Sequence, residues 1–356
     1  MIHRQRPLFS AHNHSRVSVD KYFDQIHERR PASLKLWIVD IIRRGTLEIA
    51  RENVTVQRRK FHCLRSEATK RIEQIGFTFL EGYHEALASS SVMALGEHIE
   101  QTVIAQNRGF AFEGAAMALM LLDQLGLSRR SFSDFLYGPG ARHAYMVHVG
   151  AGWALARLPW ARWRLRHAVS KLDPLLRWLS VDGFGFHEGY FNWPVTLGRH
   201  AMPRSIGGYA RRAFDQGLGR SIWFVEGTDP DQVGTSISGF PAPRQRDLWS
   251  GVGLACAYAG GAGPTELLRI KKLAGEHMPA VAQGAAFAAE ARDRADNPVE
   301  HCELACRYLC DLSAKAAASL TQEAKKTLPC DEAIPAYEIW RTRVQARLSR
   351  AGKEVL

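Results

Sequence analysis

Residues 182–193 read Asp-Gly-Phe-Gly-Phe-His-Glu-Gly-Tyr-Phe-Asn-Trp, and this stretch decides the fold. The same phrase appears at residues 76–83 as Gly-Phe-Thr-Phe-Leu-Glu-Gly-Tyr, so both copies fit Gly-Phe-x-Phe-x-Glu-Gly-Tyr. A shorter relative, Gly-Phe-Ala-Phe-Glu-Gly, occupies residues 109–114. Three copies of so unusual a phrase indicate an internal repeat.

The glycine that opens the phrase recurs along the chain at a nearly constant spacing. The series is Gly76, Gly109, Gly150, Gly183, Gly217, Gly251 and Gly284. Successive members are 33 or 34 residues apart, except for one gap of 41 that we interpret as an insertion around residues 137–140. Six of the seven units read glycine, apolar, small, large apolar, and Arg220 is the exception at the fourth position.

A period near 34 residues is typical of a repeat made of two helices and their turns. Glycine inside a helix costs about 1 kcal/mol relative to alanine, so each repeat glycine is expected at a close contact with another helix. Period-two alternation, which would indicate strands, is scarce. The sequence therefore predicts an all-α fold built as a helical-hairpin repeat array, either a TPR-like α-solenoid or a compact α-superhelix.

Composition and turn signals divide the chain into three segments. Residues 1–60 are predicted to be a polar N-terminal extension with a leading helix, and residues 61–328 the helical repeat domain. Pro329 and Pro335 precede a C-terminal amphipathic helix and tail over residues 329–356. A proline interrupts helices because it lacks the backbone N–H, so these two mark a boundary.

The chain has 356 residues and a net charge of +11, which favours acidic partners such as nucleic acid, an anionic membrane or an acidic carrier protein. Alternatively, the positive charge reflects only an arginine-rich composition, and no acidic partner is involved. Residues 160–167 interleave arginine with tryptophan, but a second long basic stripe is missing, which disfavours nucleic acid. No signal peptide or membrane span is evident, so we expect a cytoplasmic protein, with peripheral association to a membrane partner left open.

Two patterns could hold a metal, and neither is convincing. Glu81 and His84 form a Glu-x-x-His pair, but a di-iron bundle needs a second pair and two further glutamates. Cys302, Cys306 and Cys310 fall on one drifting helix face, which favours core packing over a metal or cluster site. We therefore predict no metal site, and the sequence leaves the cofactor unknown.

Acid–base candidates lie inside the glycine phrases. His187 and Glu188 could act as a general acid–base pair, with Glu81 at the equivalent place in the earlier copy. Alternatively, these glutamates and Glu113 anchor neighbouring repeats through backbone or arginine contacts. Phosphate-loop, hydrolase-elbow and zinc-protease signatures are absent.

Several blocks of the repeat resemble the UnbL-type family of enediyne biosynthesis proteins, a domain of unknown function. They are residues 108–119 (Arg-Gly-Phe-Ala-Phe-Glu-Gly-Ala-Ala-Met-Ala-Leu), 145–154, 185–191 (Gly-Phe-His-Glu-Gly-Tyr-Phe), 211–221, 247–255 and 282–288. The resemblance spans roughly residues 76–345 and assigns no catalytic residue. It implies a role in maturing a polyketide, with a conserved soluble protein and a conserved membrane protein of the same pathway as partners.

Two functions of different classes remain open. In the first, the protein acts on a polyene, or helps to mature it, inside an apolar groove. The predicted proton-transfer or ligating residues are then Glu81, His84, Glu113, His148, His187 and Glu188, and the predicted groove residues are Phe79, Phe112, Phe186, Tyr190 and Trp193. In the second, the protein is a scaffold without chemistry that docks a polyketide synthase, a carrier protein or a membrane partner.

Overall fold

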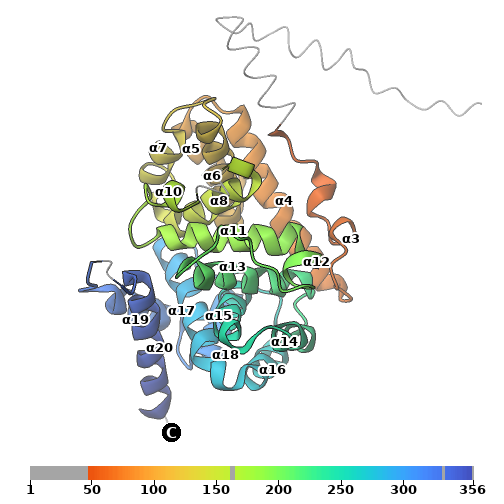
Figure 1. The fold of residues 1–356 in the computed structure, drawn as a ribbon, viewed down its shortest axis with the longest axis vertical. Helices are drawn as coiled ribbons and strands as arrows, with labels where there is room; N and C mark the ends of the chain where they lie inside the picture. The colour runs from red at the N-terminus through yellow and green to blue at the C-terminus, as the bar shows by residue number, and fades with distance from the viewer. Residues whose placement is uncertain (1–46, 161–164, 331–332, 355–356) are drawn as a thin grey trace, which may run out of the picture. The chain divides into compact units, whose positions relative to one another are not determined.

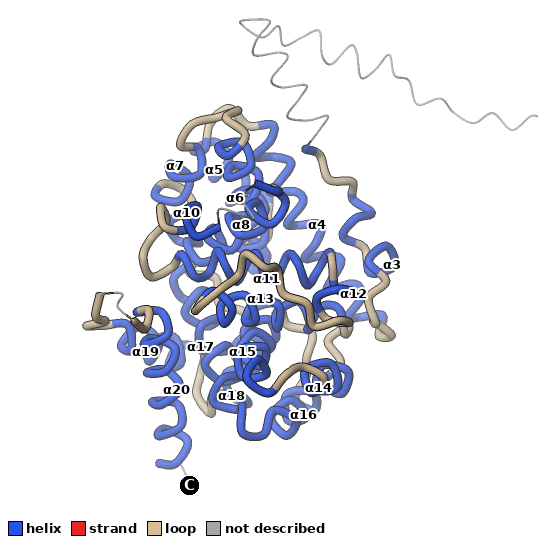
Figure 2. The backbone as a smooth tube through the Cα atoms, viewed as in Figure 1, coloured by secondary structure: helices blue, strands red, loops and turns tan. Residues whose placement is uncertain are grey.

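The computed structural model describes residues 47–160, 165–330 and 333–354. Seven long helices carry the glycine phrases, and we call them the core helices. They are α4 (Ser66–Ala88), α6 (Arg108–Gln124), α8 (Ala144–Arg157), α11 (Arg177–Phe191), α13 (Ala210–Val225), α15 (Ala242–Ala259) and α17 (Met278–Arg294). No strand occurs in these three ranges (Figure 2). The prediction of an all-α fold is therefore confirmed.

Shorter helices lie between the core helices or directly after the last one. They are α5 (Val92–Thr102), α7 (Ser131–Tyr137), α10 (Leu165–Val169), α12 (Trp193–Thr196), α14 (Pro230–Ser238), α16 (Pro264–Ala274) and α18 (Glu300–Leu309). Two longer helices, α19 (Ala314–Lys325) and α20 (Ala336–Glu354), follow the row, and α3 (Val56–Arg59) precedes it. Four 3₁₀ turns complete the described structure: η1 (Arg51–Val54), η2 (Ala105–Asn107), η3 (Ala141–His143) and η4 (Gly275–His277).

Each core helix packs against the next core helix along the chain, from α4 through to α17 (Figure 1). The predicted two-helix unit is thus present, with the core helices lying next to one another. Gln216 Nε2 donates to Asp182 Oδ2 in the N-terminal halves of α13 and α11, and the rings of Tyr190 and Phe224 meet near the C-terminal ends of these helices. These two contacts show that the neighbouring core helices α11 and α13 run in the same direction.

Six of the seven core helices are buried around most of their circumference, and α4 keeps a solvent-facing side that includes Glu67 and Lys70. All residues of α6 from Gly109 to Leu122 and all of α8 from Ala144 to Ala156 are buried. A helix that is apolar around its whole circumference is stable only when it is surrounded by protein. The connecting helices supply that cover, and their sequences show the charged, one-sided pattern of surface helices.

Repeat glycines allow the core helices to approach one another. A Cβ atom built on Gly251 would lie 2.0 Å from the backbone oxygen of Gln216 on α13, and one on Gly217 would lie 1.8 Å from that of Asp182 on α11. Gly150, Gly183 and Gly284 meet a neighbouring helix backbone in the same way. Only glycine fits such contacts, because any side chain would push the two backbones apart.

The expectation of a helix–helix contact is wrong for the first two glycines of the series. A Cβ on Gly76 would meet the side chain of Val54 in η1, and a Cβ on Gly109 would lie 1.9 Å from the hydroxyl oxygen of Tyr258. In α4 and α6 the close backbone approach is made instead by Gly82 and Gly114, the glycines that end the phrase. The reason is that η1 and the Tyr258 ring occupy the space in front of the opening glycines.

The row of core helices curls until its two ends meet. Arg71 of α4 donates through Nε to the backbone oxygen of Ala259 at the end of α15, at 2.8 Å. Arg292 of α17 donates to the backbone oxygen of Gln106, at 2.7 Å, just before α6 begins. The two ends of the row are therefore linked, α4 to the end of α15 and α17 to the start of α6, which is the compact form of superhelix rather than an open solenoid.

Residues 47–65, which we call the strap, precede α4 and pack on the core helices. The hydroxyl of Tyr83 donates to the backbone oxygen of Leu47 at 2.6 Å, and that of Tyr190 donates to Val54 at 3.2 Å. These tyrosines end the two full copies of the repeated phrase. The two copies therefore converge on one segment of the chain, which explains why only they carry the complete phrase.

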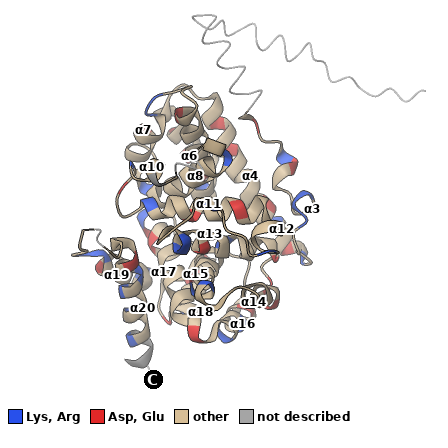
Figure 3. Cartoon of the chain, viewed as in Figure 1, with Lys and Arg blue, Asp and Glu red and all other residues tan. Residues whose placement is uncertain are grey.

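The described segments form one compact unit that begins at Leu47 and includes α20. Helix α20 packs against α17, where the Trp340 ring lies 4.3 Å from that of Phe287. The predicted leading helix within residues 1–46 and the side chains of Arg162, Arg164 and Arg166 lie outside the described residues. Over the rest of the chain, basic and acidic residues are interspersed along the helices (Figure 3).

Cys302 and Cys306 of α18 and Cys310, which directly follows this helix, are buried. The thiol of Cys310 donates to the backbone oxygen of Ala282 at 3.3 Å, and that of Cys306 lies 3.9 Å from the oxygen of Ala285. Burial raises the pKa of Cys256 on the neighbouring α15 well above its usual value, so this thiol stays protonated. In the part of the chain that the structure describes, no three His, Cys, Asp or Glu side chains are grouped as metal ligands.

Candidate functional site

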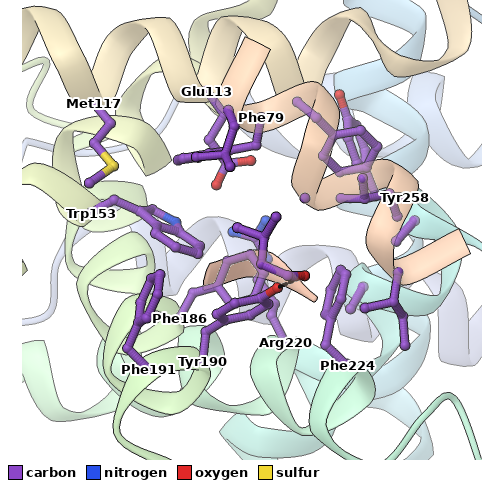
Figure 4. A pocket seen from close by; sticks show the side chains of 18 of the residues that line it. Phe79, Glu113, Met117, Trp153, Phe186, Tyr190, Phe191, Arg220, Phe224 and Tyr258 are labelled. Carbon is purple, nitrogen blue, oxygen red and sulfur yellow. Dashed lines mark hydrogen bonds between the residues drawn. The ribbon is translucent and has the colours of Figure 1, made fainter. Parts of the chain in front are cut away.

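A cavity of about 40 Å³ lies where six core helices and the strap meet (Figure 4). Its walls are mostly aromatic and aliphatic. They include Ile49 and Val54 of the strap, Phe79 of α4, Phe110, Glu113 and Met117 of α6, Trp153 of α8, Phe186, Tyr190 and Phe191 of α11, Arg220 and Phe224 of α13, and Tyr258 of α15. A cavity of this volume has room for about three water molecules.

The fourth position of the repeat unit supplies much of this wall. Phe79, Trp153, Phe186 and Arg220 all hold that position in their units, and all four line the cavity. The reason is geometric: the repeat glycine contacts the next helix, and a residue three positions later lies almost one turn away, on a neighbouring part of the same face.

Glu113 is the carboxyl group of this cavity. Its side chain is almost completely buried, and burial raises its pKa to about 8, an effect that Arg220 opposes and Asp182 reinforces. A carboxyl group in an apolar site favours its neutral form because the charged form loses hydration. Glu113 is therefore mostly protonated at pH 7.

Arg220 reaches the cavity from a buried ion pair. Its Nη1 donates to Asp182 Oδ1 at 2.6 Å, and Gln216 donates to the other carboxylate oxygen at 2.8 Å. The guanidinium also lies 4.5 Å from the ring centre of Phe186. Burial lowers the pKa of Arg220, but the charges of Asp182 and Glu113 raise it above its usual value overall, so Arg220 stays positively charged.

Three polar atoms around the cavity have no hydrogen-bond partner among the described residues, namely Glu113 Oε1, Arg220 Nε and the Tyr258 hydroxyl, and the indole N–H of Trp153 has only the Glu113 carboxyl group as a neighbour. The side chains to which they belong are only 1–5% exposed. Buried polar groups are nearly always paired, and an unpaired one costs about 1–3 kcal/mol. Their concentration at one cavity indicates that water or a ligand completes the site.

Three of the five predicted groove residues line the cavity, namely Phe79, Phe186 and Tyr190. Phe112 does not, because its ring stacks on His143 with centroids 4.2 Å apart. Trp193 does not either. Its Nε1 donates to the backbone oxygen of Arg59 at 3.0 Å, so it holds the strap in place.

Of the six predicted polar residues, Glu113 alone lines the cavity. Glu81 is exposed on α4, and His84 accepts a hydrogen bond from the backbone N–H of Ile49 at 3.4 Å. Glu81 and His84, which the sequence predicts among the polar residues of the groove, therefore do not line this cavity.

The histidines of the core are engaged locally. His148 Nδ1 donates to the backbone oxygen of Ala144 at 2.7 Å, and burial lowers its pKa. His187 lies 3.3 Å from Glu188, which also accepts from Asn192 at 3.2 Å. The His187 ring packs edge-on against Trp153 at 5.6 Å, so this pair contacts a cavity wall rather than the cavity itself.

Sequence reasoning missed Arg220, Trp153 and Tyr258 as site residues. A signal for Arg220 was present, because it is the one charged residue at the fourth repeat position, where the other units have large apolar side chains. Tyr258 left no such signal. It follows the repeat phrase of α15, and only the curling of the row brings it to Phe110 of α6, at a ring distance of 5.3 Å.

The fold and site define an all-helical protein in which a closed row of helices surrounds a buried, aromatic-walled cavity with one neutral acid and one arginine. A family model described as "Protein of unknown function (DUF1702)" matches residues 38–348, and the chain belongs to this family. No curated protein and no solved structure matches it. None of the described helices combines the length and apolar character needed to cross a membrane.

Proposed function

We propose that this protein binds a polyene intermediate of an enediyne-type polyketide pathway in the central cavity and takes part in its maturation. Two observations support the polyene as ligand. The blocks of sequence that resemble enediyne biosynthesis proteins lie on the core helices, and the cavity that these helices surround has aromatic walls. Burial of apolar surface stabilises such a complex by about 25 cal/mol per Å².

The observation that carries a chemical role is the state of Glu113. Its pKa of about 8 lies close to physiological pH, whereas burial raises those of the lining tyrosines, Tyr190 and Tyr258, above their already high ordinary values. A group with such a pKa can both give and accept a proton near neutral pH. Glu113 is therefore the described lining residue best suited to exchange a proton with a bound polyene.

A ligand enters only if the strap moves. The cavity of about 40 Å³ is far smaller than a typical ligand pocket of several hundred Å³. Ile49 and Val54 of the strap form part of its wall. Tyr83 and Tyr190 hold the first part of the strap by hydrogen bonds to its backbone, whereas His62 and Arg65 attach its end to Glu226 and Glu266. Displacement of residues 47–54 alone would therefore open the cavity while the end of the strap stays attached.

Complementation tests this proposal. In a producing strain that lacks the gene, the wild-type protein should restore the mature product, measured by mass spectrometry of the culture extract. Glu113→Gln, which keeps the size of the side chain but cannot exchange the proton, should leave a polyene to accumulate. Glu81→Gln, at the exposed glutamate of α4, is the matched control and should restore the product.

A scaffold that docks a synthase, a carrier protein or a membrane partner predicts a different result. Both variants would then restore the product equally, because Glu113 is buried and Glu81→Gln replaces a single exposed carboxylate with an amide of the same size. That outcome would refute a chemical role for Glu113. The predicted role of His187 and Glu188 stays a prediction, and His187→Ala in the same strain tests it.

A further inference from the structure

A second cavity adjoins the first. It has a volume of about 30 Å³ and lies between α8, α11, α13, α15, α17 and α20, where Met146, Leu254, Phe287 and Trp340 form much of its wall. Arg220 and Tyr258 line both cavities. These two side chains therefore form the partition between two apolar spaces, and a ligand bound there could extend to either side.

Tyr258 is held rigidly in this partition. Its ring lies edge-on to Phe110. The guanidinium of Arg292, on α17, lies 4.1 Å from the centre of the Tyr258 ring. Gly109 of α6 leaves the space that its hydroxyl occupies, because a Cβ there would be 1.9 Å from the hydroxyl oxygen. Despite this support, the hydroxyl has no hydrogen-bond partner among the described residues. The fold therefore holds the Tyr258 hydroxyl in a fixed place where no described residue forms a hydrogen bond with it.

The unpartnered groups are mainly donors. Arg220 Nε carries one N–H and no lone pair for acceptance, and the Tyr258 hydroxyl can donate. Glu113 in its neutral form adds an O–H donor as well as an acceptor. A pure hydrocarbon cannot satisfy any of them. A molecule with an acceptor oxygen satisfies several at once, and the positive charge of Arg220 favours an oxygen that carries negative charge.

We propose that the ligand of this site is an elongated apolar molecule that bears a carbonyl or carboxylate oxygen, and that Tyr258 and Arg220 recognise this oxygen at the partition. This inference rests on the proposed function. The conjugated chain extends from there into the aromatic cavity beneath the strap. The substrate class is therefore an oxygen-bearing polyene, such as a ketone or an acid, rather than a bare polyene hydrocarbon.

Binding of two fluorescent polyenes to the full chain tests this inference. cis-Parinaric acid has a conjugated chain with a carboxylate, and diphenylhexatriene is a conjugated hydrocarbon without oxygen. The wild-type protein should bind the acid at least tenfold more tightly. Tyr258→Phe should weaken the binding of the acid about tenfold, in line with a lost hydrogen bond to a charged group, and should leave the binding of diphenylhexatriene unchanged.

Tyr337→Phe is the matched control. Tyr337 is also a fully buried tyrosine, but its hydroxyl contacts Gln216 and it lines neither cavity. This variant should bind both probes as the wild type does. Equal affinity of the wild type for both probes, no binding of either, or an equal loss of both in Tyr258→Phe would overturn the inference. The binding assay involves no pathway enzyme, so its result is independent of complementation. The inference about the ligand can therefore fail while the proposed function holds, and the proposed function can fail while the inference holds.

Discussion

Arg220 stands where the other repeat units place a large apolar side chain, and its surroundings show what such an exception requires. The charge is buried at 4% exposure and is balanced by Asp182, which is itself fully buried. A buried pair of this kind adds little net stability compared with apolar residues, but removing one partner is expensive. Such an arrangement is best explained by a function at the cavity that Arg220 lines.

Substitution of either partner should therefore destabilise the protein strongly. Asp182→Asn and Arg220→Met should each lower the free energy of unfolding by about 3–5 kcal/mol, because each leaves one buried charge without its partner. The double variant should lose clearly less than the sum of the two. Urea unfolding of the four proteins measures the coupling.

An exposed ion pair provides the control for that cycle. Lys70 and Glu67 on the surface of α4 lie 3.0 Å apart and should show a coupling of less than about 1 kcal/mol. A coupling between Asp182 and Arg220 that is no larger than this surface value would show that the buried pair is not a unit.

The pKa of Glu113 has a consequence for stability. Because its pKa is raised on folding to about 8, the folded protein holds a proton that the unfolded chain releases above about pH 4.5. The free energy of unfolding that this bound proton contributes is therefore lost as the pH rises from about 4.5 to 8, and above that range the contribution no longer changes. Glu113→Gln should be increasingly stabilised relative to the wild type across this window, by up to a few kcal/mol.

Chemical unfolding at pH 5, 6.5 and 8 checks the prediction. The difference in unfolding free energy between Glu113→Gln and the wild type should grow with pH. A difference that is the same at all three values would mean that Glu113 has an ordinary pKa in the folded protein. Glu81→Gln, at an exposed position, should show no such trend.

At the scale of the helices, the repeat glycines determine how closely the core helices pack. Gly251→Ala places a methyl group 2.0 Å from the Gln216 backbone oxygen, and this overlap can be relieved only if α13 and α15 separate. We expect a loss of about 2 kcal/mol or more in unfolding free energy, as for overpacked cores. Thermal and urea unfolding measure it.

Gly207→Ala is the control for that variant. A Cβ at Gly207 would have no neighbour within 4 Å, so its effect should stay within about 1 kcal/mol and could be slightly stabilising through the unfolded chain. If Gly251→Ala were as stable as Gly207→Ala, the close contact between α13 and α15 would be wrong.

The helices were predictable from the sequence, and the strap was not. The period of 33–34 residues follows from a contact that each unit makes with the next, so it is written into every copy. The strap makes its contacts once, partly through backbone oxygens such as those of Leu47 and Val54 and partly through side chains such as His62, which lies 2.8 Å from Glu226. Contacts that occur once in the chain leave no periodic pattern in the sequence. The signal lies in Tyr83 and Tyr190, whose role becomes clear only when both reach the same segment.

At the scale of the whole molecule, the closure of the row creates the site. Curvature in a repeat array accumulates from a small rotation at each unit, and a period alone does not specify that rotation. For this reason Glu113 could be identified as a candidate from its phrase, whereas its association with Tyr258, which is 145 residues further along the chain, could not. Closure also explains why the two cavities adjoin at Arg220 and Tyr258.

The central claim is that this enclosed space holds an oxygen-bearing apolar ligand. A crystal structure of the protein with cis-parinaric acid tests it most directly. The account predicts elongated density in the cavity alongside Trp153 and Phe186, with the carboxylate within hydrogen-bond distance of the Tyr258 hydroxyl and Arg220, and with the strap displaced from its present contacts. Density for the acid only on the outer surface, with the cavity unchanged, would contradict it.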